Sequence, residues 1–228
     1  MNERHRQKRL MALRYVLAIP RSIRINYSLL PWRQAWHLPI LIARNTVIEN
    51  LSGKINIEAP KLRMGLFKIG FSTYQGTDTL FHRTRLNLRG TIVVAGESDF
   101  GTGSSVEVSE TGVLTLGHMS HVGPQSLLVC HKSVSLGSHA RISWCCTLMD
   151  TDQHVLVDAS GMSQNADRPI ALGENVWVGC HTIITKGTIL PNNTTVGAGS
   201  VVHGRFDEEC TVLAGNPARV VKKGVRRD

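Results

Sequence analysis

Residues 170–202 read IALGENVWVGCHTIITKGTILPNNTTVGAGSVV, and an aliphatic residue recurs at every sixth position of this stretch. The recurring residues are Leu172, Val178, Ile184, Leu190, Val196 and Val202. A period of six matches neither the 3.6-residue turn of an α-helix nor the two-residue alternation of a two-sided strand. It predicts an all-β fold, a parallel β-helix in which each six-residue unit forms one short strand and one tight corner.

The same spacing predicts which side chains lie over one another. Three units form one triangular coil of about 18 residues, so each inward-facing residue stacks on the residue one coil later. The predicted stacks are Leu172 with Leu190, Val178 with Val196, and Ile184 with Val202. Small or β-branched residues that fit a corner follow four places after five of the aliphatic residues: Val176, Thr182, Thr188, Thr194 and Ser200.

The register divides the rest of the chain into segments. Hexad spacing extends back to Leu88 with two slips, which predicts a β-helix over residues 88–215. Residues 43–87 contain short β-like runs without a clear register, and we interpret them as irregular first coils. The register stops over residues 150–169, which predicts a loop extruded from one corner. Loops of this length in compact folds are usually functional or disordered. Residues 216–228 form a basic C-terminal tail.

Residues 1–42 are predicted to form a basic N-terminal segment. Eight basic residues and one acid within residues 1–33 give that part a formal charge of +7. Pro20, Pro31 and Pro39 limit the segment to one or two short helices. The apolar run at residues 10–19 is too short to span a bilayer. It favours a helix that caps the end of the β-helix, and the alternative is a helix that lies on a membrane surface.

Composition narrows the class of partner and the compartment. The net charge of +9 favours anionic ligands or surfaces. Aromatic residues make up 5% of the chain and do not interleave with the basic runs, so we expect no nucleic-acid partner. The five cysteines form no Cys-x-x-Cys pair, and we find no convincing signal peptide. We therefore expect reduced thiols in the cytoplasm, with the inner face of the membrane as an alternative location.

The C-terminal part resembles the hexapeptide-repeat acyltransferases, in particular the maltose, galactoside and xenobiotic O-acetyltransferases and similar polysaccharide O-acetyltransferases. The resemblance rests on RPI at 168–170, LGENVWVG at 172–179, VGAGS at 196–200 and GNPARVVK at 215–222. It covers roughly residues 88–222 and is most specific after Ile170. It implies a left-handed β-helix and a homotrimer with active sites between subunits. It also implies acetyl-CoA-dependent transfer of an acetyl group to a saccharide hydroxyl, in surface polysaccharide biosynthesis.

The resemblance implies roles for individual residues. His154, in the extruded loop, would be the general base that deprotonates the acceptor hydroxyl as it attacks the thioester directly, a task that suits an imidazole. Asp152 is a candidate to orient His154, although a backbone carbonyl could do the same. Trp177 is a candidate to border the active site, and its alternative role is packing in the core or between subunits. Backbone N–H groups near Gly179 and Cys180 would face the developing oxyanion.

Further residues are assigned to acetyl-CoA by the same resemblance. The pantetheine chain is expected to run past Gly179, Cys180, Gly197, Ala198 and His203. By their charge, and not by the resemblance, Arg219 and Lys222 are candidates to neutralise the CoA phosphates, with Lys186 as a weaker candidate. The alternative is that these residues belong to a solubilising basic tail. His203 and Gly204 stand where relatives often carry threonine and lysine, which leaves one phosphate contact open. The basic N-terminal segment would suit an acceptor that is linked to lipid.

Other interpretations use other residues. Cys145 and Cys146 invite a cysteinyl intermediate, but both lie in the hexad register and no paired base is signalled. A zinc site would use corner histidines and Cys130, but their spacing fits no defined motif, so we expect no metal. The histidines concerned are His118, His121, His131 and His139. An antibiotic- or amino-sugar-modifying acetyltransferase is the alternative activity, and a non-catalytic β-helix subunit is the alternative class.

Overall fold

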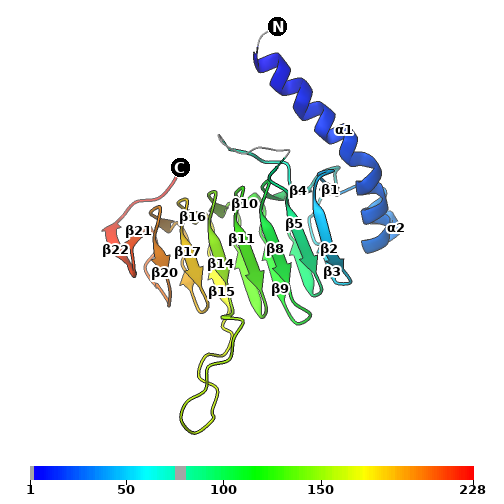
Figure 1. The fold of residues 1–228 in the computed structure, drawn as a ribbon. Coiled ribbons are helices and arrows are strands. Elements are labelled where there is room, and N and C mark those ends of the chain that lie inside the picture. The colour runs from blue at the N-terminus through cyan, green and yellow to red at the C-terminus, as the bar shows by residue number, and fades with distance from the viewer. Residues whose placement is uncertain (1–2, 75–80) are drawn as a thin grey trace.

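The computed structural model describes residues 3–74 and 81–228, so that residues 75–80 of the expected first coils lie outside the described residues. Short strands wind into a β-helix with three sheets, and a loop projects from one of its edges (Figure 1). A long helix, α1 (Glu3–Leu29), and a short one, α2 (Trp32–Ala35), lie at the N-terminal end (Figure 1). The strands β1 (Ile40–Ile42) and β22 (Ala218–Lys223) lie at opposite ends of the β-helix (Figure 1).

From β1 to β18 each coil contributes one strand to each sheet, and β19–β22 extend sheets A and B only. Sheet A consists of β1 (Ile40–Ile42), β4 (Phe67–Ile69), β7 (Ser98–Phe100), β10 (Ser120–Val122), β13 (Arg141–Ile142), β16 (Trp177–Val178), β19 (Thr195–Val196), β21 (Thr211–Gly215) and β22 (Ala218–Lys223). Sheet B consists of β2 (Val47–Leu51), β5 (Arg85–Leu88), β8 (Ser105–Val108), β11 (Leu127–Cys130), β14 (Thr147–Met149), β17 (Ile183–Thr185) and β20 (Val201–Val202). Sheet C consists of β3 (Lys54–Ile57), β6 (Thr91–Val94), β9 (Val113–Leu116), β12 (Ser133–Leu136), β15 (Ile170–Leu172) and β18 (Ile189–Leu190). We name the edges AB, BC and CA after the sheets that they join.

The stacking predicted from the hexads is confirmed. Leu172 pairs with Leu190, Val178 with Val196 and Ile184 with Val202, all in parallel register. The six side chains are at most 3% exposed and belong to one continuous core. A coil therefore buries its apolar residues against the coils above and below it, as a repeat protein must.

The corner residues have a hydrogen-bonding role as well as a suitable size. Thr188, Thr194 and Ser200 are buried, and each hydroxyl donates to the carbonyl three residues earlier, at 2.7, 2.9 and 2.7 Å. A buried carbonyl without a partner would be costly. The recurrence of Thr and Ser at this position is thus explained by the need to satisfy the backbone where it turns.

The expectation of only short N-terminal helices is wrong. Helix α1 has 27 residues and passes through Pro20. Pro20 is exposed, so water can bind the carbonyl that loses its N–H donor. Beyond Pro20 the inner side of the helix is held in place by burial of Ser22, Ile25 and Asn26. Tertiary packing overrides the local preference of proline.

The buried polar residues of α1 complete the first strand of sheet A. Strand β1 has β4 on one side only. On its other side the Asn26 side chain accepts from the Ile40 N–H and donates to the Ile40 carbonyl, at 3.1 and 2.7 Å. The Ser22 hydroxyl accepts from the Ile42 N–H at 3.0 Å. These side chains satisfy backbone groups that an open sheet edge would leave unpaired.

The β-helix extends somewhat beyond the hexad register at both ends. The first strand begins at Ile40, and coils within residues 43–87 already supply all three sheets. At the other end, Ala218–Lys223 of the basic tail forms β22, which pairs antiparallel with β21. The final hairpin turns the chain back on itself and ends the parallel winding.

Candidate functional site

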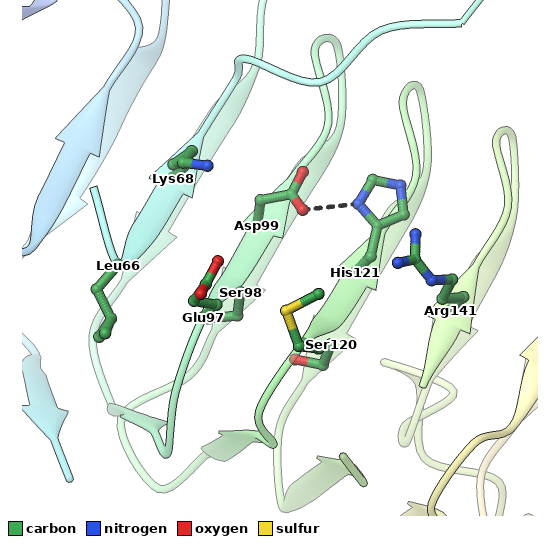
Figure 2. A pocket seen from close by; sticks show the side chains of 9 residues that line it. Leu66, Lys68, Glu97, Ser98, Asp99, Ser120, His121 and Arg141 are labelled. Carbon is green, nitrogen blue, oxygen red and sulfur yellow. Dashed lines mark hydrogen bonds and ion pairs between the residues drawn. The ribbon is translucent and has the colours of Figure 1, made fainter. Parts of the chain in front are cut away.

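One histidine-containing cavity lies on the outer face of sheet A. His121 Nδ1 and an Asp99 carboxylate oxygen are 2.8 Å apart (Figure 2). The Ser72 hydroxyl donates to the other Asp99 oxygen at 2.5 Å. Lys68 and Arg141 occupy neighbouring strands in the same register. The cavity has a volume of about 200 Å³. It is a charged surface whose histidine is already paired.

The extruded loop leaves from edge BC, between β14 and β15, and its two ends are fastened to the body. Asp150 is buried, and its carboxylate accepts backbone N–H bonds from His131, Lys132 and Ser133 at 2.7, 2.8 and 2.7 Å. The Arg168 N–H donates to the Asp150 carbonyl at 3.1 Å. Residues between these anchors project away from the β-helix (Figure 1).

Asn165 fixes the backbone around His154. Its side-chain amide donates to the His154 carbonyl at 2.7 Å and to the Asp152 carboxylate at 2.9 Å. Its side-chain oxygen accepts from the Leu156 N–H at 2.6 Å. The His154 side chain remains exposed, so the loop holds the position of the residue while leaving its ring accessible.

Lys186 ties the loop to the coil below it. Its ammonium group donates to the Asp152 carboxylate and to the Asn165 carbonyl, both at 2.5 Å, and its side chain is only 9% exposed. The hydrogen bond from Lys186, followed by that from Asn165, lowers the pKa of Asp152. The structure therefore places Asp152 against Lys186 and Asn165 instead of against the His154 ring. Lys186 is likewise engaged within the chain.

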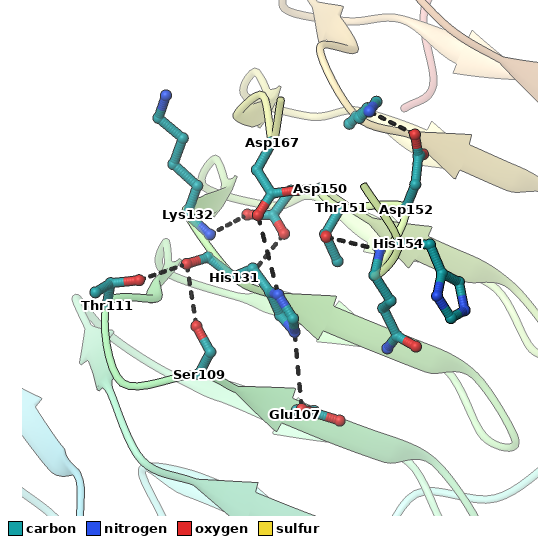
Figure 3. Close-up of polar contacts among 12 residues, drawn as sticks. Glu107, Ser109, Thr111, His131, Lys132, Asp150, Thr151, Asp152, His154 and Asp167 are labelled. Atoms are coloured by element: carbon teal, nitrogen blue, oxygen red, sulfur yellow. Dashed lines mark hydrogen bonds and ion pairs between the residues drawn. The ribbon is translucent and has the colours of Figure 1, made fainter. Parts of the chain in front are cut away.

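A second cavity, of about 230 Å³, lies between the loop and the body, and we call it the loop pocket. It is lined by residues that include His131, Thr151, His154, Asn165 and Asp167. The His131 ring lies between Glu107 and Asp167, with nitrogen-to-oxygen distances of 3.8 and 4.0 Å (Figure 3). Its Nε2 atom is buried and has no hydrogen-bond partner among the described residues.

The proximity of His131 to His154 was not foreseen from the sequence. Val129 pairs with Met149, so this coil is longer than the 18-residue repeat and the hexad register slips between them. His131 directly follows β11 at edge BC, one coil before the loop begins. The sequence contained this information. If each hexad had been assigned to its sheet across the slip, both His131 and the start of the loop would have fallen at edge BC.

Gly179, Cys180, Gly197 and Ala198, which we call the glycine edge, lie together at edge AB. The Gly199 N–H donates to the Cys180 carbonyl at 2.9 Å, which joins the two coils. A Cβ on Gly179 would lie 2.6 Å from the Ala198 nitrogen, so coil stacking already requires glycine there. The Gly179 N–H donates to the Val196 carbonyl at 2.8 Å. Of the two expected oxyanion donors, Cys180 is the one that remains a candidate.

The other predicted residues divide between these places. Lys186 and His203 follow β17 and β20, so they lie at edge BC and not on the glycine edge. Trp177 is 42% exposed on sheet A, next to edge AB.

Of the two basic residues of β22, Arg219 lies near the glycine edge. It pairs with Ala214, whose Cβ lies 3.3 Å from the position that a Cβ on Gly197 would take. Lys222 lies farther along β22, opposite Val212.

The structure also describes the cysteines and corner histidines on which the other interpretations rest. All five cysteines are free thiols. Burial raises the pKa of Cys146 to about 11, which keeps it a neutral thiol and a poor nucleophile. Among residues 3–74 and 81–228, no three His, Cys, Asp or Glu side chains gather in a metal-binding arrangement.

Comparisons with known proteins find acetyltransferases among the relatives of this chain. It is 32% identical over 101 residues to the galactoside O-acetyltransferase of Escherichia coli K12, which covers 44% of this chain and 49% of that protein. It is 29% identical over 129 residues to a protein of the same organism provisionally named a colanic acid biosynthesis acetyltransferase, covering 54% and 66%. The chain thus spans about half to two thirds of the length of these relatives. No protein-family model matches it.

The fold has a counterpart among solved structures. The polySia-specific acetyltransferase NeuO superposes with a TM-score of 0.51 at 18% identity, covering 83% of this chain and 78% of that one. At this identity the likeness concerns the fold alone.

Proposed function

We propose that this chain, a homologue of the hexapeptide-repeat acetyltransferases, transfers the acetyl group of acetyl-CoA to a saccharide hydroxyl. The observation that carries the proposal is the loop pocket, where the His154 ring is accessible while Asn165 and Lys186 hold the loop around it. The sugar-modifying relative supports the acceptor class. A surface polysaccharide is the proposed acceptor within that class, as the name of the second relative suggests.

The reaction follows from the chemistry of an imidazole beside a hydroxyl. His154 takes the proton of the acceptor hydroxyl as that oxygen attacks the thioester carbonyl. The tetrahedral intermediate collapses with loss of the CoA sulfur, which recovers the proton from the imidazolium. The loop backbone holds the base in position, so that proximity contributes to the rate. His131 also lines the loop pocket, and we assign it a contact with the acceptor.

The proposed enzyme is a homotrimer that shares each site between two copies. In one chain the loop pocket lies at edge BC and the glycine edge at AB, with sheet B between them. A neighbouring copy that presents its glycine edge to the loop pocket would bring acetyl-CoA to His154. The pantetheine would then lie along the glycine edge, with Trp177 at its border and Arg219 near the phosphates.

The test is release of free thiol from acetyl-CoA in the presence of a panel of oligosaccharides and amino sugars. We expect turnover with a saccharide and a product that hydroxylamine deacetylates, because hydroxylamine cleaves O-acetyl esters and spares N-acetyl amides. A hydroxylamine-resistant product would establish the amino-sugar alternative instead. Absence of turnover with all acceptors, in protein that binds acetyl-CoA, would favour a non-catalytic subunit.

The role of His154 is tested with a matched control. His154→Ala should lower kcat by about 10²–10⁴-fold with the affinity for acetyl-CoA nearly unchanged. His121→Ala removes a histidine of the sheet A cavity, which the proposed site does not use, and should keep kcat within about threefold of wild type. If His121→Ala is the inactive variant and His154→Ala retains more than about a tenth of the turnover, the base lies at the Asp99–His121 pair.

A further inference from the structure

The outward side of α1 carries apolar side chains that neither the β-helix nor the loop pocket uses. The inner side is buried through Ala18, Ser22, Ile25 and Asn26. Opposite to it, exposed residues recur at alternating intervals of three and four, which forms a continuous stripe on a helix. This outer stripe consists of Leu13, Val16, Pro20, Ile23 and Tyr27, and the four residues other than Pro20 are 42–60% exposed.

Two basic residues of α1, Arg14 and Arg21, turn toward the β-helix and do not add their charge to the stripe. The Arg14 guanidinium donates to the Gly70 carbonyl at 2.8 Å and to the Thr102 hydroxyl at 3.2 Å. Arg21 donates to the carbonyls of Arg44 and Thr46 at 3.1 and 2.6 Å. Burial of the Arg14 side chain lowers its pKa. Both arginines therefore hold α1 on the first coils.

The surroundings of the stripe suit the interface between lipid and water. Trp32 and Trp36, which follow α1 in the chain, are 70% and 75% exposed. The Arg33 guanidinium lies 5.5 Å from the centre of the Trp32 ring. Tryptophan rings favour the headgroup region of a bilayer. The segment is strongly basic and has Glu3 as its one acid; besides the two inward arginines, its basic residues are Arg4, Arg6, Lys8, Arg9, Arg24 and Arg33.

We propose that the outer stripe of α1 docks on an anionic lipid surface, with the helix lying in the plane of that surface. The stripe is roughly 20 Å long at 1.5 Å of rise per residue, and none of the described helices is long and apolar enough to cross a membrane. The charge of the basic N-terminal segment argues against a second copy of this chain as the partner of the stripe. Pairing two such segments would bring together two charges of +7, whereas anionic headgroups attract each of them.

One helix can therefore both cap the β-helix and bind lipid, because the two tasks use opposite sides. Deleting the helix would remove both at once, so the test changes only the outer side. Full-length protein is sedimented with vesicles of phosphatidylglycerol mixed with phosphatidylcholine, and with vesicles of phosphatidylcholine alone. We expect binding to the anionic vesicles, its loss at high salt, and little binding to the neutral ones.

The decisive variant is Val16→Glu/Ile23→Glu. It should lower partition onto anionic vesicles by about tenfold or more at an unchanged melting temperature, because both side chains are exposed. Met64→Glu/Val113→Glu makes the same change of charge at exposed apolar residues elsewhere and should bind like wild type. Wild-type protein that ignores anionic vesicles, or an outer-stripe variant that binds as well as wild type, overturns the proposal. A third outcome also overturns it: wild-type protein binds no vesicles, and the outer-stripe variant has a lower mass by light scattering than wild type. The stripe would then be an interface between protein chains.

Discussion

At the scale of single residues, Lys186 shows how a contact changes the role expected from a charge. A lysine near the predicted CoA site suggested a phosphate ligand, yet its ammonium group bonds to Asp152 and Asn165 of the loop. Because the pKa of Asp152 is lowered in the folded protein, its ion pair with Lys186 stabilises the fold when Asp152 is ionised. The ion pair contributes fully above the ordinary aspartate pKa of about 3.9 and is lost as the pH falls through the lowered value in the folded protein.

Lys186→Met tests this role, because methionine keeps an apolar stem and lacks the ammonium group. We expect kcat to fall about tenfold, since the loop that carries His154 loosens, while KM for acetyl-CoA stays within about twofold. Lys223→Met is the control, because Lys223 bonds to Glu208 at 2.5 Å, in the C-terminal part of the chain and away from the loop. A large rise in KM for acetyl-CoA at unchanged kcat would contradict this role and would indicate that Lys186 binds the CoA phosphates.

At the scale of elements, α1 and the coils differ in how far the sequence could predict them. The coils follow from a local rule, because each aliphatic residue stacks on the residue one coil later and Leu172 already identifies Leu190. The course of α1 through Pro20 depends on Ser22 and Asn26 meeting a strand edge that the sequence does not reveal. Long-range contacts of this kind decide against local propensity, and no pattern in residues 1–42 announces them.

Asn26→Leu tests how much the completed strand edge contributes. Leucine is close in size but leaves the buried Ile40 N–H and carbonyl without these partners, at a cost of about 2–4 kcal/mol. For a chain of this length we expect the melting temperature to fall by about 5–10 °C. Ser28→Ala is the control, because the Ser28 hydroxyl bonds only within the helix, to the Ile25 carbonyl. A fall of less than about 2 °C for Asn26→Leu would mean that water replaces the lost bonds.

At the scale of the whole molecule, the candidate site is divided between two edges. The resemblance grouped His203 with Gly179 along the pantetheine, and Lys186 was a candidate for the CoA phosphates. Both residues follow strands of sheet B, so their corners do not coincide with the glycine edge, which follows sheet A. This division could have been predicted by assigning each hexad to its sheet. The relation of one copy to the next could not, because the contacts between copies leave no periodic signal in a single sequence.

The division makes mixed assemblies informative. His154→Ala leaves the glycine edge intact, and Ala198→Trp is designed to block that edge while leaving His154 intact. If each site takes His154 from one copy and the glycine edge from its neighbour, each variant alone should be inactive. Co-expressed chains should then regain activity, because some interfaces join a wild-type loop to a wild-type glycine edge.

The measurement pairs thiol release with light scattering on assemblies purified through two different affinity tags, so that every particle contains both variants. We expect a mass near three chains and activity at a substantial fraction of wild type, on the order of a third, because about one interface in three is intact. Mixed particles of that mass that stay inactive would place both halves of the site in one chain. An active monomer would refute sharing altogether, and the loop would then have to move across sheet B to meet acetyl-CoA.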